Sequence, residues 1–389
     1  MLLLYIIKLE YDTSRRAQVT CNMFSLLPRE LTGVIFNYLS PSCIIQLGAA
    51  SKQVFENLSK DDFGYKFTSF VPLELIFDPT NNFAPRKLVI GYFDSFIVRS
   101  LKDLSFLPCH TRQIYFDDSF NEFFTKDVQF PQHLTHLIFG WSFNQPVSQI
   151  NLPLTLTHLQ FGIDFNQPVD NLHIDHLEYL KCLTFGYYFN HSVEYLKLPR
   201  YKSLTELQFG AHFNKSIDKL ELPQTLTHLT FGLAFDQPVN HFKLPIDGGT
   251  LKFLTFGWDF NQFVDNIKLP HSLTHLTFGY KFNRPINNLK LPTSLTHLTF
   301  GFCFDQNIDD LQLLPSSNLS HLKFGYRFNK SLDKIKINFP CSLVQITLDN
   351  CFDQSTKTLS LSHPQIKLIH PKFVYKCNEP THMHRINRI

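Results

Sequence analysis

A Phe-Gly pair recurs nine times along this chain, at intervals of 22 to 25 residues. A second Phe stands three residues after each of these glycines, and Asn or Asp always follows that Phe. Self-similarity with a fixed period of about 20 to 50 residues is typical of proteins built as a stack of equivalent units. The pairs therefore restrict the fold to a repeat array, whose glycines are Gly140, Gly162, Gly186, Gly210, Gly232, Gly257, Gly279, Gly301 and Gly325.

Each repeat carries two short runs in which apolar side chains alternate with polar ones. The first run has the pattern L-x-x-L-x-F, as at Leu273, Leu276 and Phe278, and the second has I-x-x-L-x-L, as at 286–291. Alternation with a period of two is typical of a β-strand with one buried face. The pattern predicts a mainly β fold, a parallel β-solenoid of about 12 coils of 22–25 residues, with two strands per coil and two parallel sheets.

The repeated positions have separate expected roles. Both Phe rows are expected to point inward, because 41 Phe residues need a buried place. The glycine is expected either to take a positive φ or to let the backbones of neighbouring coils approach closely. The Asn/Asp row is expected to bond turn amides in its own coil and the next. Imperfect copies at 88–96, 114–121 and 346–353 are expected to cap the array, with Asp117 and Asp349 in the glycine slot of the last two.

Composition argues against several classes of protein. Charged residues are 18% of the chain and the formal net charge is +3, which leaves no footprint for nucleic acid or an anionic membrane surface. The eight cysteines form no CxxC pair, which favours reduced thiols in the cytoplasm or the nucleus. No stretch is long enough to span a bilayer, and no catalytic motif appears. We therefore expect a non-catalytic protein with no cofactor and no metal site.

The repeat resembles leucine-rich repeats in its L-x-x-L-x-L core and, more closely, the FNIP repeat. The namesake residues of that repeat are matched by Phe143-Asn144-Gln145-Pro146-Val147, Phe165-Asn166-Gln167-Pro168-Val169 and Phe282-Asn283-Arg284-Pro285-Ile286. Other copies lose the proline, as in Phe189-Asn190-His191-Ser192-Val193. The resemblance covers residues 110–360 and implies an LRR-like solenoid that binds other proteins.

Residues 23–62 differ in pattern from the repeats. Leu31, Ile35 and Leu39 recur every four residues, as on one face of a helix. With Leu27-Pro28 ahead of them, these positions resemble an F-box, a small helical motif that docks on the Skp adaptor of SCF-type cullin–RING ubiquitin ligases. The resemblance implies an adaptor-binding surface formed by Leu27, Pro28, Leu31, Ile35, Leu39, Ile44 and Leu47.

Ile44-Ile45 departs from the F-box pattern, in which many members carry Asp-Leu, so the docking surface is expected to be weaker or altered. The alternative is a helical cap that only seals the solenoid. An F-box followed by FNIP repeats resembles an architecture of giant DNA viruses of amoebae and of social amoebae. The implied division of the chain is an unstructured extension (1–22), an F-box (23–62), a linker with degenerate capping repeats (63–109), the FNIP solenoid (110–360) and a C-terminal cap and tail (361–389).

Two rows of residues beside the Phe-Gly pair are candidates for contact with a target protein. One row stands four residues before the glycine and is mostly His, and the other follows the glycine directly and often holds Trp or Tyr. Exposed Trp and Tyr are typical anchors of protein interfaces. The candidate residues are His136, Trp141, His158, Tyr187, His228, Trp258, His275, Tyr280, His297, His321 and Tyr326.

Other interpretations of these two rows stay open. Histidines at a strand spacing of about 4.8 Å could form a solvated ladder or bind a metal ion, although zinc needs ligands that converge on one point. The aromatic rings could lie in the core, because the period does not fix the facing of a residue after a turn glycine.

The two parts together predict a substrate-recognition adaptor. In this interpretation the F-box holds a Skp-family adaptor, the solenoid holds a target protein, and ubiquitin transfer occurs on other subunits. A different class is a binding scaffold or decoy that occupies the host's Skp adaptor, or another protein, without promoting transfer. A third is a repeat protein with no link to a ligase.

Overall fold

The computed structural model describes most of the repeat region. The described residues are 71–72, 94–199, 203–246, 248–309, 311, 313–314, 316–332, 339–349 and 351–370. The expected extension and the predicted F-box lie outside them. The chain forms two compact units. Unit 1 comprises Met1–Lys215 and Lys219–Leu226, and unit 2 comprises Ser216–Asp218 and Thr227–Ile389.

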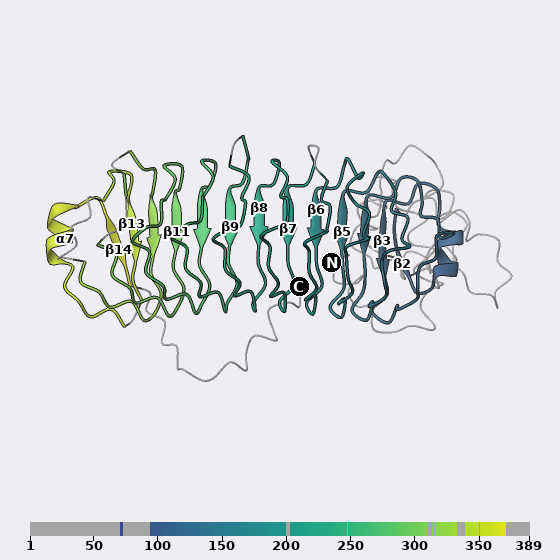
Figure 1. Ribbon diagram of the computed structural model, residues 1–389, viewed down its shortest axis with the longest axis horizontal. Coiled ribbons are helices and arrows are strands. Elements are labelled where there is room, and N and C mark those ends of the chain that lie inside the picture. The colour runs from purple at the N-terminus through teal and green to yellow at the C-terminus, as the bar shows by residue number, and fades with distance from the viewer. Residues whose placement is uncertain are drawn as a thin grey trace, which may run out of the picture. The chain divides into compact units, whose positions relative to one another are not determined.

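Unit 1 is a ladder of short parallel strands. Its strands are β1 (Val71–Pro72), β2 (Ser95–Val98), β3 (Gln113–Phe116), β4 (His136–Ile138), β5 (His158–Gln160), β6 (Cys182–Thr184) and β7 (Glu206–Gln208). Each strand pairs with the next one along the chain, so equivalent residues of successive coils lie side by side (Figure 1). A 3-10 helix, η4 (Leu101–Phe106), connects β2 to β3.

Unit 2 repeats the same architecture. Its strands are β8 (His228–Thr230), β9 (Phe253–Thr255), β10 (His275–Thr277), β11 (His297–Thr299), β12 (His321–Lys323), β13 (Gln345–Thr347) and β14 (Lys367–Ile369). All six successive pairs are parallel and in register. A short helix, α7 (Lys357–Ser362), connects β13 to β14 (Figure 1).

Phenylalanine fills the interior, as the sequence predicted. In unit 2, Phe278 and Phe282 of one coil are buried, with ring centroids 4.1 Å apart. Each ring also stacks on its equivalent in the next coil, Phe278 on Phe300 at 5.6 Å and Phe282 on Phe304 at 6.0 Å. Burying each ring stabilises the fold by about 1.5–3 kcal/mol. For the described residues, the prediction of a mainly β parallel solenoid of about twelve coils is confirmed.

The second half of the coil differs from the prediction. Ile286 and Leu289 are buried as expected, but no strand forms there, and the described strands of each unit make one parallel sheet. The backbone amides of this half bond within their own coil: Leu289 N–H donates to the Ile286 carbonyl, and Leu295 N–H to the Pro292 carbonyl, both at 3.1 Å. Successive turns leave no run of extended residues to pair with the next coil, so the predicted second sheet is wrong.

The repeated glycine is required by close approach of backbones, the second of its two expected roles. A Cβ placed on Gly279 would lie 2.6 Å from the carbonyl carbon of Gly257, and closer still to its oxygen. The other expected role, a positive φ, is wrong. Among the described glycines that conformation occurs at Gly248, which is not one of the nine and has φ 75°.

The Asn/Asp row forms a ladder of side-chain hydrogen bonds in each unit. The backbone N–H of Asn283 donates to Oδ1 of Asn261 at 2.9 Å, and the N–H of Asp305 donates to Oδ1 of Asn283 at the same distance. Equivalent bonds of 2.8–3.2 Å join the other described members. The row therefore satisfies a turn amide in the following coil, as predicted.

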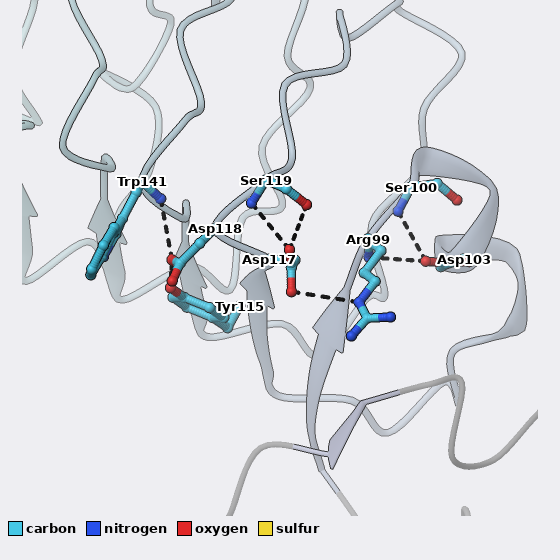
Figure 2. Close-up of polar contacts among 8 residues, drawn as sticks. All are labelled: Arg99, Ser100, Asp103, Tyr115, Asp117, Asp118, Ser119 and Trp141. Carbon is cyan, nitrogen blue, oxygen red and sulfur yellow. Dashed lines mark hydrogen bonds and ion pairs between the residues drawn. The ribbon is translucent and has the colours of Figure 1, made fainter.

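The first coils of unit 1 depart from the repeat. The register of β2 against β3 pairs Val98 with Phe116, which places Arg99 in the glycine slot. The prediction that residues 88–96 form the imperfect copy of this coil is therefore wrong, because the slot lies beyond that range. Asp117 fills the same slot in the next coil, as predicted, and lies 3.5 Å from the Arg99 guanidinium (Figure 2). Hydrogen bonds from Ser119, with the nearby Arg99, hold the pKa of Asp117 below its usual range. At this end an ion pair between Arg99 and Asp117 occupies the slot in which glycines of neighbouring inner coils approach each other closely.

Candidate protein-binding face

The outer face of the sheet carries both candidate rows. The middle residue of each three-residue strand is buried, so the first and third residues point outward. In the β3 coil the hydroxyl of Tyr115, an outward residue, hydrogen-bonds the carboxylate of Asp118, which follows the glycine slot (Figure 2). In the next coil Trp141 occupies the equivalent slot, and its backbone N–H donates to Oδ1 of Asp118 at 3.3 Å. The residue after the glycine therefore lies beside the outward strand positions.

In unit 2 the first strand residues stack into one continuous column. We call this the ring column: His228, Phe253, His275, His297 and His321. Neighbouring ring centroids are 4.3–4.4 Å apart. The in-register strands set this spacing, and the partly exposed rings cover each other's faces.

Each histidine of the ring column is held by the residue before it. Thr274 Oγ1 lies 2.9 Å from Nδ1 of His275 and 3.1 Å from the carbonyl oxygen of Lys252. A carbonyl only accepts, so the single hydroxyl proton goes there and Nδ1 of the imidazole donates to the hydroxyl. Thr296 and Ser320 make the same pair of bonds for the next two histidines. The neutral rings therefore carry their proton on Nδ1.

Unit 1 holds a shorter version of this arrangement. His136 and His158 stack at 4.1 Å, and a preceding threonine bonds each Nδ1. Cys182 and Glu206 fill the next two places. Burial and the neighbouring Glu206 raise the pKa of the Cys182 thiol to about 11, so it stays protonated at neutral pH.

The residues after the glycine form a second column in unit 2. We call it the aromatic column: Trp258, Tyr280, Phe302 and Tyr326, with centroids 3.9, 4.5 and 4.7 Å apart and ring planes within 10° of parallel. The equivalent places in unit 1 hold Trp141, Ile163, Tyr187 and Ala211. Tyr187 instead contacts Tyr188 and His212, at 5.1 and 5.2 Å.

The predicted site residues all lie at the surface. Trp141 is 55% exposed, and the other ten are partly exposed, so the interpretation that places the rings in the core is wrong. Sequence reasoning left out Phe253 and Phe302, although the repeat period places both in the two columns. Among the described residues, no group of three or more His, Cys, Asp and Glu side chains is arranged to hold a metal ion.

The histidines are expected to make stability depend on pH. Burial first, and then neighbouring histidines, lower the pKa of His275 and His297, so the folded state binds fewer protons than the unfolded state. Stability is therefore present above the unfolded pKa of about 6.5 and falls as the pH drops through it. Urea unfolding at several pH values should show a steeper loss of unfolding free energy toward pH 5.5 for the wild type than for His275→Phe/His297→Phe. Equal slopes would contradict this prediction.

Comparisons with known proteins identify the repeat. A sequence model described as the FNIP Repeat matches residues 125–164, 196–234, 213–253, 235–281 and 265–303. No curated protein matches the chain. A solved structure described as "CroV588 a novel circular LRR protein structure" is 33% identical and aligns over 72% of this chain, with a TM-score of 0.46. The alignment covers 49% of that protein, so the chain spans about half of its length.

The FNIP match agrees with the sequence resemblance. No helix in the described part of the chain has the length and apolar character that a bilayer crossing requires. Solenoids of the FNIP and leucine-rich type are typical of non-catalytic binding scaffolds. The coils that build the two units include FNIP repeats, as the Phe-Asn copies predicted.

Proposed function

We propose that this chain is the substrate-recognition adaptor of an SCF-type cullin–RING ubiquitin ligase. Residues 23–62 dock a Skp-family adaptor, and the outer sheet face of the solenoid holds the target protein. The chain supplies proximity: tethering raises the effective concentration of target lysines beside the loaded conjugating enzyme. The target contacts are the eleven candidate residues together with Phe253 and Phe302.

The observation that supports target binding by the solenoid is the presence of the ring column and the aromatic column on the outer face of unit 2. Partly exposed Trp and Tyr rings are typical interface anchors, and here their neighbours hold them rigidly at spacings of 3.9–4.7 Å. Rings held by stacking lose little side-chain freedom on binding, which favours affinity. The ligase half rests on the F-box resemblance of residues 23–62, whose ordered leucines and proline match a docking motif.

Affinity capture with the full chain tests both halves. The wild type is expected to retain a Skp-family adaptor and a cullin, and Leu31→Arg or Ile35→Asp to lose both while target proteins remain bound. Tyr280→Ala/Tyr326→Ala should show the reverse pattern. If the helix-face variants keep the adaptor and cullin, the ligase assignment is wrong.

A scaffold or decoy that holds the same partners without ubiquitin transfer is the second candidate. The observation that favours it is Ile44-Ile45, where many F-boxes have Asp-Leu. Reconstitution with a cullin–RING core and a captured target separates the two candidates. Ubiquitin chains on the target support the adaptor, whereas capture of both partners without chains supports the decoy.

A further inference from the structure

The face of unit 2 carries an excess of positive charge. Its positions are the residue before each strand, the first and third strand residues, and the two residues after the glycine. Over the coils of β9 to β12 these positions hold four cations, Lys252, Lys281, Lys323 and Arg327, against one carboxylate, Asp259. Lys281 pairs with Asp259 at 2.7 Å, and no ion pair within the described residues engages the other three cations. With neutral histidines the net charge is +3, as large as that of the whole chain.

The equivalent face of unit 1 has the opposite sign. In the coils of β4 to β7 the same positions hold one cation, Lys181, against two carboxylates, Asp164 and Glu206, for a net charge of −1. The coils share one architecture, so the difference comes from side chains alone. The two units therefore present equivalent surface positions with opposite net charge.

We propose that the unit 2 face between β9 and β12 binds an acidic segment of the target protein and takes up protons at His275 and His297 as it does so. The proposal rests on the proposed function for the identity of this face as the target site. Lys252, Lys323 and Arg327 attract the carboxylates over a distance of about one Debye length. The aromatic column beside them supplies apolar contact.

Proton uptake follows from the hydrogen bonds of the ring column. Nδ1 already donates to the preceding hydroxyl, and no bond within the described residues occupies Nε2 of His275, His297 or His321. In the neutral ring Nε2 has only a lone pair, which repels a carboxylate oxygen. A carboxylate on Nε2 is therefore accommodated when a proton from solvent binds there, and the N–H then donates to it.

No carboxylate of the described sheet lies beside these histidine rings, so the negative charge that favours their protonation must come from the bound partner. The groups that face these rings along the sheet are Phe253, His228 and Lys252 on one side and Lys323 and Gln345 on the other. None is a carboxylate, and strands β8 to β13 contain no Asp or Glu. Burial and neighbouring histidines lower the pKa of His275 and His297, so both are neutral at about pH 7.5. An acidic partner supplies the missing negative charge.

Nucleic acid, the other common polyanion, fits this face less well. Proteins that hold single strands stack bases on open aromatic faces. In the aromatic column each interior ring has both faces covered by its neighbours, with spacings of 3.9–4.7 Å. The stacked rings leave no gap between them for a base, so the observations favour a protein segment over nucleic acid as the ligand.

Fluorescence anisotropy with the full chain tests the proposal. The probe is a short fluorescein-labelled oligo-glutamate peptide, with oligo-lysine and single-stranded DNA of equal length for comparison. Oligo-glutamate should bind about five to thirty times more tightly at about pH 6 than at about pH 7.5, since each bound proton contributes up to about tenfold per pH unit. Oligo-lysine should not bind, and circular dichroism at both pH values confirms that the chain is folded.

Matched variants locate the effect. His275→Phe/His297→Phe keeps a stacking ring, the one that Phe253 already provides in this column, and should remove most of the pH dependence. Lys323→Gln/Arg327→Gln should weaken binding about threefold or more at both pH values. His241→Phe/His271→Phe changes two exposed histidines of unit 2 that belong to neither column, and it should leave binding unchanged.

Three results would overturn the proposal: binding that does not change with pH, tighter binding of the DNA than of oligo-glutamate, or an equal loss in the ring-column variant and the His241/His271 control. No ligase subunit enters the measurement, so its failure leaves the adaptor assignment standing. Loss of the Skp interaction in the capture experiment would in turn leave the acidic-partner proposal untouched.

Discussion

Gly279→Ala is expected to lower the unfolding free energy of unit 2 by more than about 3 kcal/mol, although it adds a single methyl group. The new Cβ would sit 2.6 Å from the carbonyl carbon of Gly257, and closer to its oxygen. Side-chain overlaps can be relieved by rotation, but here the obstacle is the backbone of the neighbouring coil. Relief requires separation of the two coils, which breaks the pairing of β9 with β10.

Urea unfolding followed by circular dichroism measures this loss. Thr277→Ala is the control, because Thr277 lies on the outer face of the same strand and should cost less than about 1 kcal/mol. Since repeat proteins unfold in neighbouring groups of coils, hydrogen exchange should show the lost protection centred on β9 to β11. Equal stability of the two variants would show that the coils can separate freely at this point.

Phe282→Ala is expected to cost about 3–5 kcal/mol, the range typical of removing a fully buried aromatic ring. Phe282 has no exposed surface, and its ring lies 4.1 Å from Phe278 and 6.0 Å from both Phe260 and Phe304. The cavity would interrupt a continuous row, and neighbours held by their own stacking cannot collapse into it.

Phe263→Ala is the matched control, because Phe263 is 48% exposed and its ring meets only the Arg284 guanidinium among the described ring contacts, at 4.8 Å. It should cost less than about 1 kcal/mol, in line with a surface cation–π contact. Thermal and urea unfolding of both variants give the comparison. A cost for Phe282→Ala as small as that of the control would argue against a close-packed phenylalanine core.

Sequence alone predicted the coil, its inward phenylalanines and its Asn/Asp ladder, because each recurs at a fixed position and has one plausible physical role. The second strand at 286–291 was predicted wrongly. Its alternation of apolar residues does mark an inward face, but turns that begin at Ile286 and Pro292 produce the same alternation. For the glycine, a positive φ and a close approach of backbones give the same sequence pattern, and only the position of the neighbouring coil distinguishes them.

The candidate face was predictable in position but not in detail. The repeat period placed His275 and Tyr280 in their rows, but it could not show that side chains of successive coils stack into columns. The direction of the Nδ1 proton depends on where the Thr274 hydroxyl points, which a sequence does not contain. The sign of the local charge, by contrast, could have been counted from the sequence once the outward positions were known.

The Asn/Asp ladder also bears on how such an array changes in evolution. Asn283, for example, accepts from the coil after it and donates to the coil before it, so the ladder has a direction and inner coils of this kind are interchangeable. Duplication or loss of one whole inner coil would join two surfaces that already match. An insertion of half a coil would place unlike surfaces together, so length in this lineage is expected to change in steps of one repeat.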